Sequence, residues 1–156
     1  RLKWPNDVLL ELPGGGLGKL AGILVEVSGD AAGPCEVVIG MGINVGLPAA
    51  FRDALDQPAA AIHDQAPGVS RNELAVELIE ALLPLVAGFE ERGFAAWQEA
   101  WNERHAFGGR EVDILRGERR EAAVAEGVDV SGNLLVRRDG RLERLAGGEI
   151  SLRARP

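Results

Sequence analysis

Lysine is rare in this chain, and both of its lysines lie near the start. Seventeen side chains are basic, but only Lys3 and Lys19 are lysines and the other fifteen are arginines. An ammonium is a compact, strongly hydrated charge on a flexible stem, and it can bind a phosphate or a carboxylate as a point contact. Codon usage and chance also explain two lysines, so the surrounding sequence has to decide. That sequence favours a chemical role.

Two glycines interrupt an apolar run, Val37–Ile43, further along the chain. Gly40 and Gly42 point to the same face of a strand, and they reduce stability because they pack nothing and lose the most backbone entropy on folding. A bulge, or a tightly packed element above the strand, is one explanation. A flat ligand lying on a strand stripped of side chains is the other. From the residues alone, the two explanations have equal support.

Three strands have to position these residues. Apolar runs span Asp7–Glu11, Lys19–Val27 and Cys35–Val45, and the turn-forming stretches Leu12–Gly16 and Ser28–Pro34 separate them. Glycine supplies the positive φ that tight turns require. Short turns between consecutive strands predict an antiparallel meander. The triple glycine is predicted to be a hairpin turn and not a phosphate loop, because no helix start and no Gly-Lys-Ser/Thr follow it.

A helix should follow Ser70–Glu73, which has the residue types of a capping box. Apolar residues then recur at helical spacing, at Leu74, Leu78, Ile79, Leu82, Val86 and Phe89. Pro84 should bend or shorten this helix. Beyond Gly93, aromatic residues at i, i+3 and i+7 predict a second helix with its aromatic side chains in the core; they are Phe94, Trp97 and Trp101. Both helices are expected to pack across one face of the sheet.

The residues from His105 to Gly109 break the helical pattern and indicate a domain boundary. Five short alternating runs follow, at Arg110–Leu115, Glu121–Gly127, Leu134–Arg137, Arg141–Leu145 and Glu149–Arg153. Asp139-Gly140, between two of these runs, is a strong hairpin signal. Such closely spaced short strands predict a small barrel of SH3-like type. The predicted fold class is therefore α+β: an antiparallel or mixed sheet with helices packed on it, followed by a small all-β SH3-like barrel.

Four strings of the chain resemble the motifs of biotin protein ligases, in the same order and at similar spacing. They are Lys3-Trp-Pro-Asn-Asp7, Lys19-Leu-Ala-Gly-Ile-Leu-Val-Glu26, Val38-Ile-Gly-Met-Gly-Ile-Asn-Val45 and Gly147-Gly-Glu-Ile-Ser-Leu-Arg153. The resemblance covers nearly the whole chain. The glycine- and arginine-rich loop of that family, which closes over biotin and the adenylate phosphate, has no counterpart here. We therefore expect a C-terminal part of a ligase that begins partway through the catalytic domain.

The resemblance implies a class II synthetase-like, partial catalytic domain over residues 1–107 and a C-terminal SH3-like barrel domain over residues 108–156. It implies an enzyme that uses ATP and Mg²⁺ to attach biotin to a lysine of a biotin carboxyl carrier protein through biotinyl-AMP. Lys19 would contact the biotin carboxylate and the phosphate, and Asp7 would hold and deprotonate the lysine of the carrier. Asp7 also suits a plain structural role in the turn with Pro5 and Asn6.

The same matching implies further binding residues. Leu24, Gly40 and Gly42 would join Lys19 around biotin, and Asn6 and Asn44 would join Lys19 around the nucleotide.

Two neighbouring residues have open roles. Trp4 either packs under the motif or contributes to the site, and Lys3 is either a solvated strand end or a second phosphate contact. No carboxylate cluster identifies ligands for Mg²⁺. The two histidines lie far apart without ligand spacing, so the sequence predicts no protein metal site.

Composition excludes several other classes. Hydrophobic residues make up 46% and charged residues 26%, which is typical of a globular protein, and the formal charge of −7 argues against nucleic-acid binding by this chain. The single cysteine, Cys35, excludes an internal disulfide and fits a reducing compartment. No apolar run is long enough for a membrane span, and no charged-then-apolar leader indicates a signal peptide, so a cytoplasmic protein is expected. A homodimer is compatible with the sequence.

Two other functions fit the same residues. One is a non-catalytic SH3-like module that binds a protein partner or supports an oligomer, and the missing arginine loop favours it. The other is a lipoate ligase-type acyl-adenylate transferase, which shares the same chemistry. The predicted barrel and the motif that ends at Arg153 fit the biotin enzyme better.

Overall fold

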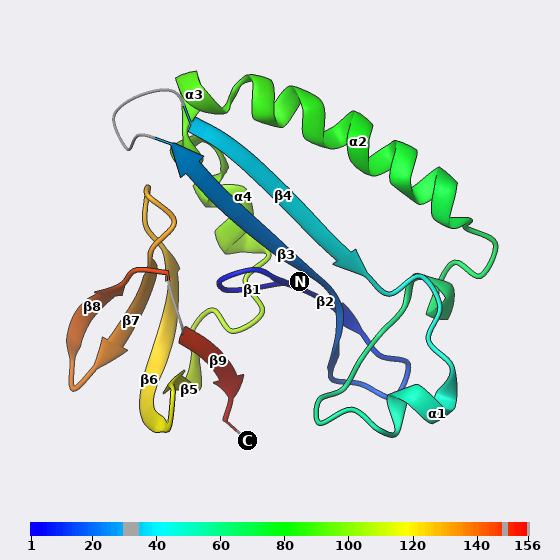
Figure 1. Ribbon diagram of the computed structural model, residues 1–156. Helices are drawn as coiled ribbons and strands as arrows, with labels where there is room; N and C mark the ends of the chain where they lie inside the picture. Colours follow the sequence, from blue (N-terminus) through cyan, green and yellow to red (C-terminus); the bar gives the residue numbers. More distant parts are fainter. Residues whose placement is uncertain (30–34, 148–149, 156) are drawn as a thin grey trace. The chain divides into compact units, whose positions relative to one another are not determined.

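The computed structural model describes residues 1–29, 35–147 and 150–155. Two compact units make up the chain: Asn6–Val69, and Arg1–Pro5 together with Ser70–Pro156 (Figure 1). The strands lie in two sheets, accompanied by short and long helices, so the predicted α+β class is confirmed. The domain division at residues 107 and 108 stays a prediction.

The unit Asn6–Val69 is built on three antiparallel strands, β2 (Asp7–Glu11), β3 (Leu17–Gly29) and β4 (Cys35–Ile43). β3 pairs with β2 on one side and with β4 on the other, as the predicted meander requires. The glycine turn before β3 is also as predicted, with φ of 86° at Gly15 and 81° at Gly16. Residues 30–34 of the second predicted turn lie outside the described residues.

A short connection follows β4 in the same unit. It holds the one-turn helix α1 (Ala49–Arg52) and the 3₁₀ turn η1 (Ile62–Asp64). Between them, the chain returns to β3, where Lys19 and Ala59 form an isolated parallel bridge. The segment around Ala59 therefore takes up the edge of β3 beyond the end of β4.

β3 carries a bulge where it pairs with β2. Val8 lies opposite Ala21, but Leu9 lies opposite Lys19, so Leu20 is an extra residue on β3. A regular register would place Leu20 opposite Leu9 and turn Lys19 to the other face of the sheet, because side chains alternate along a strand. The bulge reverses this alternation and turns Lys19 toward the face that holds Asp7.

The other unit begins with β1 (Leu2–Lys3) and continues at the helix α2 (Arg71–Ala87). The predicted capping box is confirmed, since the Glu73 amide donates to Ser70 Oγ at 3.2 Å and the Ser70 amide donates to Glu73 Oε2 at 2.9 Å. Pro84 does not end the helix, which continues for three more residues. None of the α2 residues is buried.

Three short helical segments follow α2. They are α3 (Phe89–Arg92), the 3₁₀ helix η2 (Phe94–Trp97) and α4 (Gln98–Glu103). The predicted second helix is therefore divided, and Trp97 is 37% exposed, so its assignment to the core is wrong. Packing of the helices across the sheet of β2 to β4 stays a prediction.

The C-terminal sheet has five antiparallel strands in the order β8-β7-β6-β5-β9. They are β5 (Arg110–Arg116), β6 (Arg119–Val128), β7 (Leu134–Arg138), β8 (Arg141–Leu145) and β9 (Ile150–Ala154). Its largest fully buried side chains are Val112, Ile114, Val128, Leu134, Val136 and Leu152. These strands confirm the predicted SH3-like fold, although no ladder between the described parts of β8 and β9 closes the barrel.

Side chains attach the other elements of this unit to the sheet. Asn102 on α4 accepts from the Val128 amide at 2.8 Å and donates to the Val128 carbonyl at 3.3 Å. Trp4 is buried, and its indole N–H donates to the Gly132 carbonyl at 3.0 Å. The packing role predicted as one alternative for Trp4 is thus confirmed.

Candidate active site

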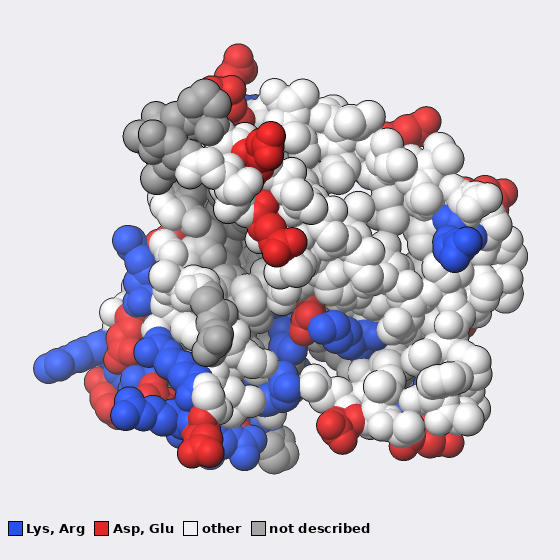
Figure 2. Space-filling model, viewed as in Figure 1, with Lys and Arg blue, Asp and Glu red and all other residues white. Residues whose placement is uncertain are grey.

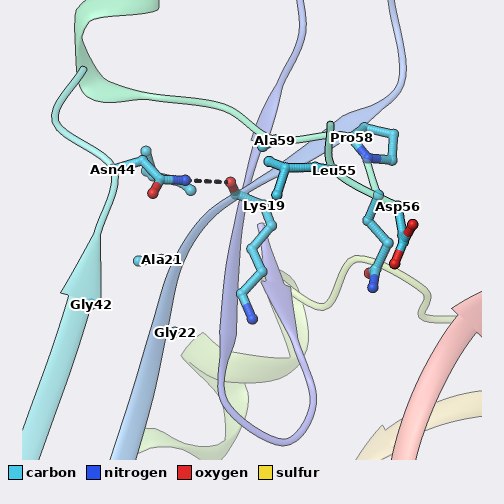
Figure 3. Close-up of a pocket in the computed structure, with 11 residues that line it drawn as sticks. Lys19, Ala21, Gly22, Gly42, Asn44, Leu55, Asp56, Pro58 and Ala59 are labelled. Atoms are coloured by element: carbon cyan, nitrogen blue, oxygen red, sulfur yellow. Dashed lines mark hydrogen bonds between the residues drawn. The ribbon is translucent and has the colours of Figure 1, made fainter. Parts of the chain in front are cut away.

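A cavity of about 360 Å³ lies in the unit Asn6–Val69 (Figure 3). One wall is formed by the ends of β3 and β4, and the other by the segment 55–59. The residues that line it are Lys19, Leu20, Ala21, Gly22, Gly42, Asn44, Leu55, Asp56, Gln57, Pro58 and Ala59. Three of the predicted site residues, Lys19, Gly42 and Asn44, therefore meet at one cavity.

Lys19 and Asp7 form an ion pair, with 2.6 Å between Lys19 Nζ and Asp7 Oδ1. The Lys19 side chain is 47% exposed and the Asp7 side chain 12% exposed. The ammonium therefore lies at the solvent side of the pair, where an incoming anion can reach it. The two residues predicted to perform the chemistry are brought into direct contact.

The backbone of Lys19 is fixed by the segment that crosses it. The Lys19 amide donates to the Pro58 carbonyl at 2.8 Å, and the Lys19 carbonyl accepts from the Ala60 amide at 3.0 Å. Asn44 Nδ2 donates to the same Lys19 carbonyl at 3.2 Å. Because the main chain is held on both sides, only the flexible stem of Lys19 has to move when its charged end changes partner.

Glycines leave space around this ion pair. Gly22 lies opposite both Asp7 on β2 and Gly42 on β4. A Cβ at Gly22 would lie 3.5 Å from Lys19 Nζ and 3.6 Å from Asp7 Oδ1. Sequence reasoning did not single out Gly22, although it lies within the motif of Lys19; the register of three strands is needed to show its role.

The faces at Gly40 and Gly42 are open. The nearest atom to a Cβ at Gly40 would be the Leu24 carbonyl oxygen at 3.8 Å, and at Gly42 the Gly22 carbonyl oxygen at 3.9 Å. The pairing of β3 with β4 is continuous over these positions. Neither a bulge nor a tightly packed element among the described residues explains the two glycines, and the ligand surface stays a prediction.

The predicted nucleotide-binding asparagines both bond to backbone groups of the same unit. Asn6 Nδ2 donates to the Ile23 carbonyl at 2.8 Å. Asn44 Nδ2 donates to the Ala60 carbonyl at 3.1 Å, in addition to the Lys19 carbonyl. Their nucleotide contacts stay predictions, and each residue also has a structural role that its motif did not reveal.

Leu24 and Lys3 lie outside the cavity. Leu24 is opposite Gly40 on the β3 and β4 hairpin and is 60% exposed, so it can border a ligand on the open glycine face. Lys3 belongs to the other unit and is only 7% exposed, which rules out the alternative of a solvated strand end.

The loop beside the cavity contains a second ion pair that the sequence did not predict. Arg52 Nη2 contacts Asp64 Oδ1, and Asp64 Oδ2 accepts from the Ala61 amide at 2.8 Å. The hydrogen bond from Arg52 and then that from Ala61 lower the pKa of the Asp64 carboxyl. Asp64 is therefore a charged partner at neutral pH.

Basic and acidic side chains alternate over the five-stranded sheet (Figure 2). Arg137 pairs with Glu126 at 2.7 Å, Arg138 with Glu121 at 2.8 Å and Arg144 with Asp129 at 2.7 Å. Pairing within the sheet is typical of a solvated charged face. These three arginines are therefore neutralised by neighbouring carboxylates.

The described residues contain neither a helix that could span a membrane nor a cluster of metal ligands. None of the helices in the described ranges is both long enough and apolar enough to cross a membrane. The described part of the chain also has no group of three histidine, cysteine, aspartate or glutamate side chains that could hold a metal ion.

The known proteins that this chain resembles include biotin ligases. Residues 107–153 match the biotin protein ligase C terminal domain. The chain is 34% identical over 154 residues to the bifunctional ligase/repressor BirA of Escherichia coli K12, an overlap of 99% of this chain and 46% of BirA. It is 34% identical over 139 residues to the biotin–[acetyl-CoA-carboxylase] ligase of Paracoccus denitrificans, an overlap of 87% and 56%.

Solved structures agree in fold. The biotin protein ligase of Aquifex aeolicus matches 99% of this chain and 64% of its own, with a TM-score of 0.81 and 24% identity. Its complex with biotin and ATP matches with a TM-score of 0.78, 25% identity and 62% coverage of that chain. This chain spans about half the length of the curated relatives. The predicted resemblance is confirmed: residues 107–153 match the biotin protein ligase C terminal domain, and 99% of the chain is similar to biotin protein ligases.

Proposed function

We propose that this chain carries part of the active site of a biotin–[biotin carboxyl carrier protein] ligase. The reaction joins biotin to a lysine of the carrier at the expense of ATP, through biotinyl-AMP. The observation that supports it best is the ion pair of Lys19 and Asp7 above Gly22, at a cavity bounded by two strands. In this proposal residues 1–107 are catalytic and residues 108–156 form the accessory SH3-like domain.

In the first step, a carboxylate oxygen of biotin attacks the α-phosphorus of ATP. This oxygen forms a bond to the α-phosphorus, the bond between the α-phosphorus and the oxygen that bridges to the β-phosphate breaks, and pyrophosphate leaves. Two anions must approach each other, and negative charge on the phosphoryl oxygens has to be stabilised. The Lys19 ammonium lies at the cavity on a fixed backbone and can contact both groups, which lowers the barrier through preorganised electrostatics.

In the second step, the lysine of the carrier attacks the carbonyl carbon of the mixed anhydride, and AMP leaves. That lysine is normally protonated, with a pKa near 10.4, so it has to lose a proton before or during attack. Asp7 is the proposed acceptor of this proton, because its carboxylate can hold the incoming ammonium and take the proton as the amide bond forms. In this proposal, Lys19 turns to the adenylate before the lysine of the carrier reaches Asp7.

The remaining predicted site residues, on β3 and β4 and at the strand ends, would bind either biotin or the nucleotide. Leu24, Gly40 and Gly42 would border biotin, and Asn6 and Asn44, at the strand ends, would border the nucleotide. Mg²⁺ would accompany ATP, but the described residues offer no cluster of carboxylates for it, so no step is assigned to the ion.

The partner in this proposal is the carrier protein, and the site of action is the cytoplasm. A homodimer is compatible with the proposal but is not required by it.

Titration calorimetry of the chain with biotin and with lipoate tests the proposal. Saturable binding of biotin, with at least tenfold weaker binding of lipoate, is the expected result. Lys19→Ala should weaken biotin binding, whereas Arg137→Ala, on the charged sheet of the other unit, should not. Absence of biotin binding would contradict the proposal and favour a non-catalytic SH3-like module, and preference for lipoate would favour a lipoate ligase.

A further inference from the structure

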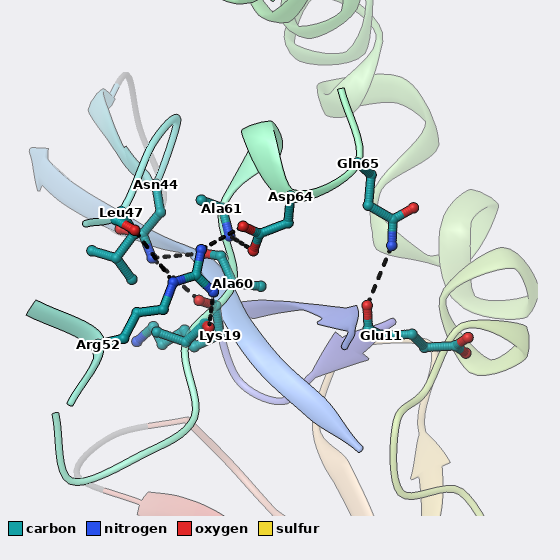
Figure 4. A network of polar contacts seen from close by, with 10 residues as sticks. Glu11, Lys19, Asn44, Leu47, Arg52, Ala60, Ala61, Asp64 and Gln65 are labelled. Carbon is teal, nitrogen blue, oxygen red and sulfur yellow. Dashed lines mark hydrogen bonds and ion pairs between the residues drawn. The ribbon is translucent and has the colours of Figure 1, made fainter. Parts of the chain in front are cut away.

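Arg52 holds together the loop that forms the second wall of the cavity (Figure 4). Its Nε donates to the Leu47 carbonyl at 3.3 Å and its Nη1 to the Ala59 carbonyl at 3.1 Å. Its Nη2 contacts Asp64, which in turn accepts from the Ala61 amide. One guanidinium thus connects the start of the loop, its return strand and the 3₁₀ turn that ends it.

The residues that fix Lys19 are the two neighbours of Ala59, which Arg52 holds. Pro58 and Ala60 flank Ala59, and their backbone groups bond to the amide and the carbonyl of Lys19. The crossing is close, since a Cβ on Gly18 would lie 2.9 Å from the carbonyl carbon of Ala59. A displacement of Ala59 therefore moves the cavity wall and the main chain of Lys19 together.

The chemistry of the side chain suits this task. The five N–H groups of arginine lie in a rigid plane, so a single side chain can serve acceptors in several directions; a lysine ammonium is a point charge on a flexible stem. Other arginines of this protein, such as Arg137, pair with a carboxylate on the neighbouring strand of a sheet. Arg52 instead binds two backbone carbonyls besides its carboxylate, and its side chain is 30% exposed.

We propose that Arg52, supported by Asp64, is a positioning residue for the nucleotide half of the site. This inference rests on the proposed function. Residues 55–59 line the cavity together with Asn44 and Lys19, at the end that the proposed function assigns to the nucleotide. Leu24 and Gly40 lie farther along β3 and β4, in the part assigned to biotin. Arg52 acts on the adenylate through Ala59 and Lys19 and does not itself take part in the reaction.

Binding of two probes separates this role from a general effect on folding. The probes are biotin and a non-hydrolysable biotinyl-AMP analogue, titrated into the chain by calorimetry. Arg52→Met should weaken the analogue at least tenfold and biotin by less than about threefold. Arg52→Lys should fall between wild type and Arg52→Met, because it keeps the charge but loses the planar fork. Arg137→Met, which removes a sheet arginine of the other unit, should change neither affinity.

Hydrogen exchange provides a second measurement that does not depend on a ligand. In Arg52→Lys, the amides of Lys19 and Ala60 should exchange faster, while the amide of Ile23, which donates to the Asn6 carbonyl, should keep its protection. An equal loss of affinity for both probes, or unchanged exchange at Lys19 and Ala60, would overturn the positioning role. Failure of the unchanged chain to bind biotin would instead overturn the proposed function, so the two failures are distinguishable.

Discussion

Asp7→Asn should strengthen the binding of biotin to this chain, while Lys19→Ala should weaken it. In the ligand-free protein, the Asp7 carboxylate competes with an incoming carboxylate for the Lys19 ammonium at 2.6 Å. Replacing the carboxylate with an amide of the same shape removes the competing charge and keeps the ammonium. The two substitutions alter partners of one ion pair, yet they should act in opposite directions.

The size of the effect follows from the exposure of the pair. Exposed ion pairs contribute about 0.2 to 1 kcal/mol, and a pair with one mostly buried partner belongs near the upper end. Losing about 1 kcal/mol of competition corresponds to a roughly fivefold tighter binding of biotin. Loss of Lys19 should cost about 1.5 to 3 kcal/mol, typical of a hydrogen bond to a charged group, or roughly 10- to 150-fold in affinity.

Calorimetry with biotin and biotinamide measures this difference directly. Biotinamide has the same ring and chain but no charge, so Asp7→Asn should leave its affinity unchanged. Raising the salt concentration should reduce the gain for biotin, because screening weakens a half-exposed pair. Weaker biotin binding in Asp7→Asn, or an equal gain for biotinamide, would refute the reasoning. In a complete ligase, the same substitution should retain adenylate formation and lose transfer to the carrier.

Three further predictions concern stability. Burial lowers the pKa of His105 to about 4. As pH falls, the unfolded chain therefore binds a proton first, near pH 6.5, and the free energy of unfolding should fall by about 2 kcal/mol between pH 6.5 and pH 4. In urea titrations, His105→Phe should show a weaker dependence of this free energy on pH. Gly18→Ala should lose about 1 to 3 kcal/mol in urea unfolding, because its Cβ would meet the backbone of Ala59 at 2.9 Å, whereas Gly14→Ala, with open space around it, should lose less than 1 kcal/mol. Ser70→Ala should lower the free energy of unfolding by about 1 kcal/mol and reduce the helix content measured by circular dichroism, since it removes the acceptor for the Glu73 amide. In each of the three cases, an unchanged value would contradict the contact on which the prediction rests.

Elements whose signals lie within a few residues were predicted well. The capping box of α2 needs only Ser70 and Glu73, and both of its bonds are present. The hairpin at Asp139 and Gly140 needs two positive φ values, and they are 49° and 75°. In contrast, burial depends on partners far along the chain, so the aromatic pattern at Trp97 predicted a core position that the structure does not have.

The pairing of Lys19 with Asp7 shows where pattern reasoning stops. Both residues were identified from their motifs, but alternation along regular strands would place them on opposite faces. A single bulged residue, Leu20, changes that parity. No residue type in the motif demands a bulge at this point, and Gly22, which leaves room for the pair, is recognisable only once the register is known.

The asparagine at the end of β4 illustrates how structural and binding roles constrain each other. The amide nitrogen of Asn44 has two hydrogens, and both of its neighbours, the carbonyls of Lys19 and Ala60, are acceptors. Orientation of the amide is therefore determined by these partners, and its donors are already engaged. A purine that meets Asn44 in this geometry has to do so through Oδ1, which accepts a hydrogen bond. At the 6-position, an exocyclic amino group satisfies that requirement and a carbonyl does not, so a contact of Oδ1 with that position would favour adenine over a 6-oxopurine.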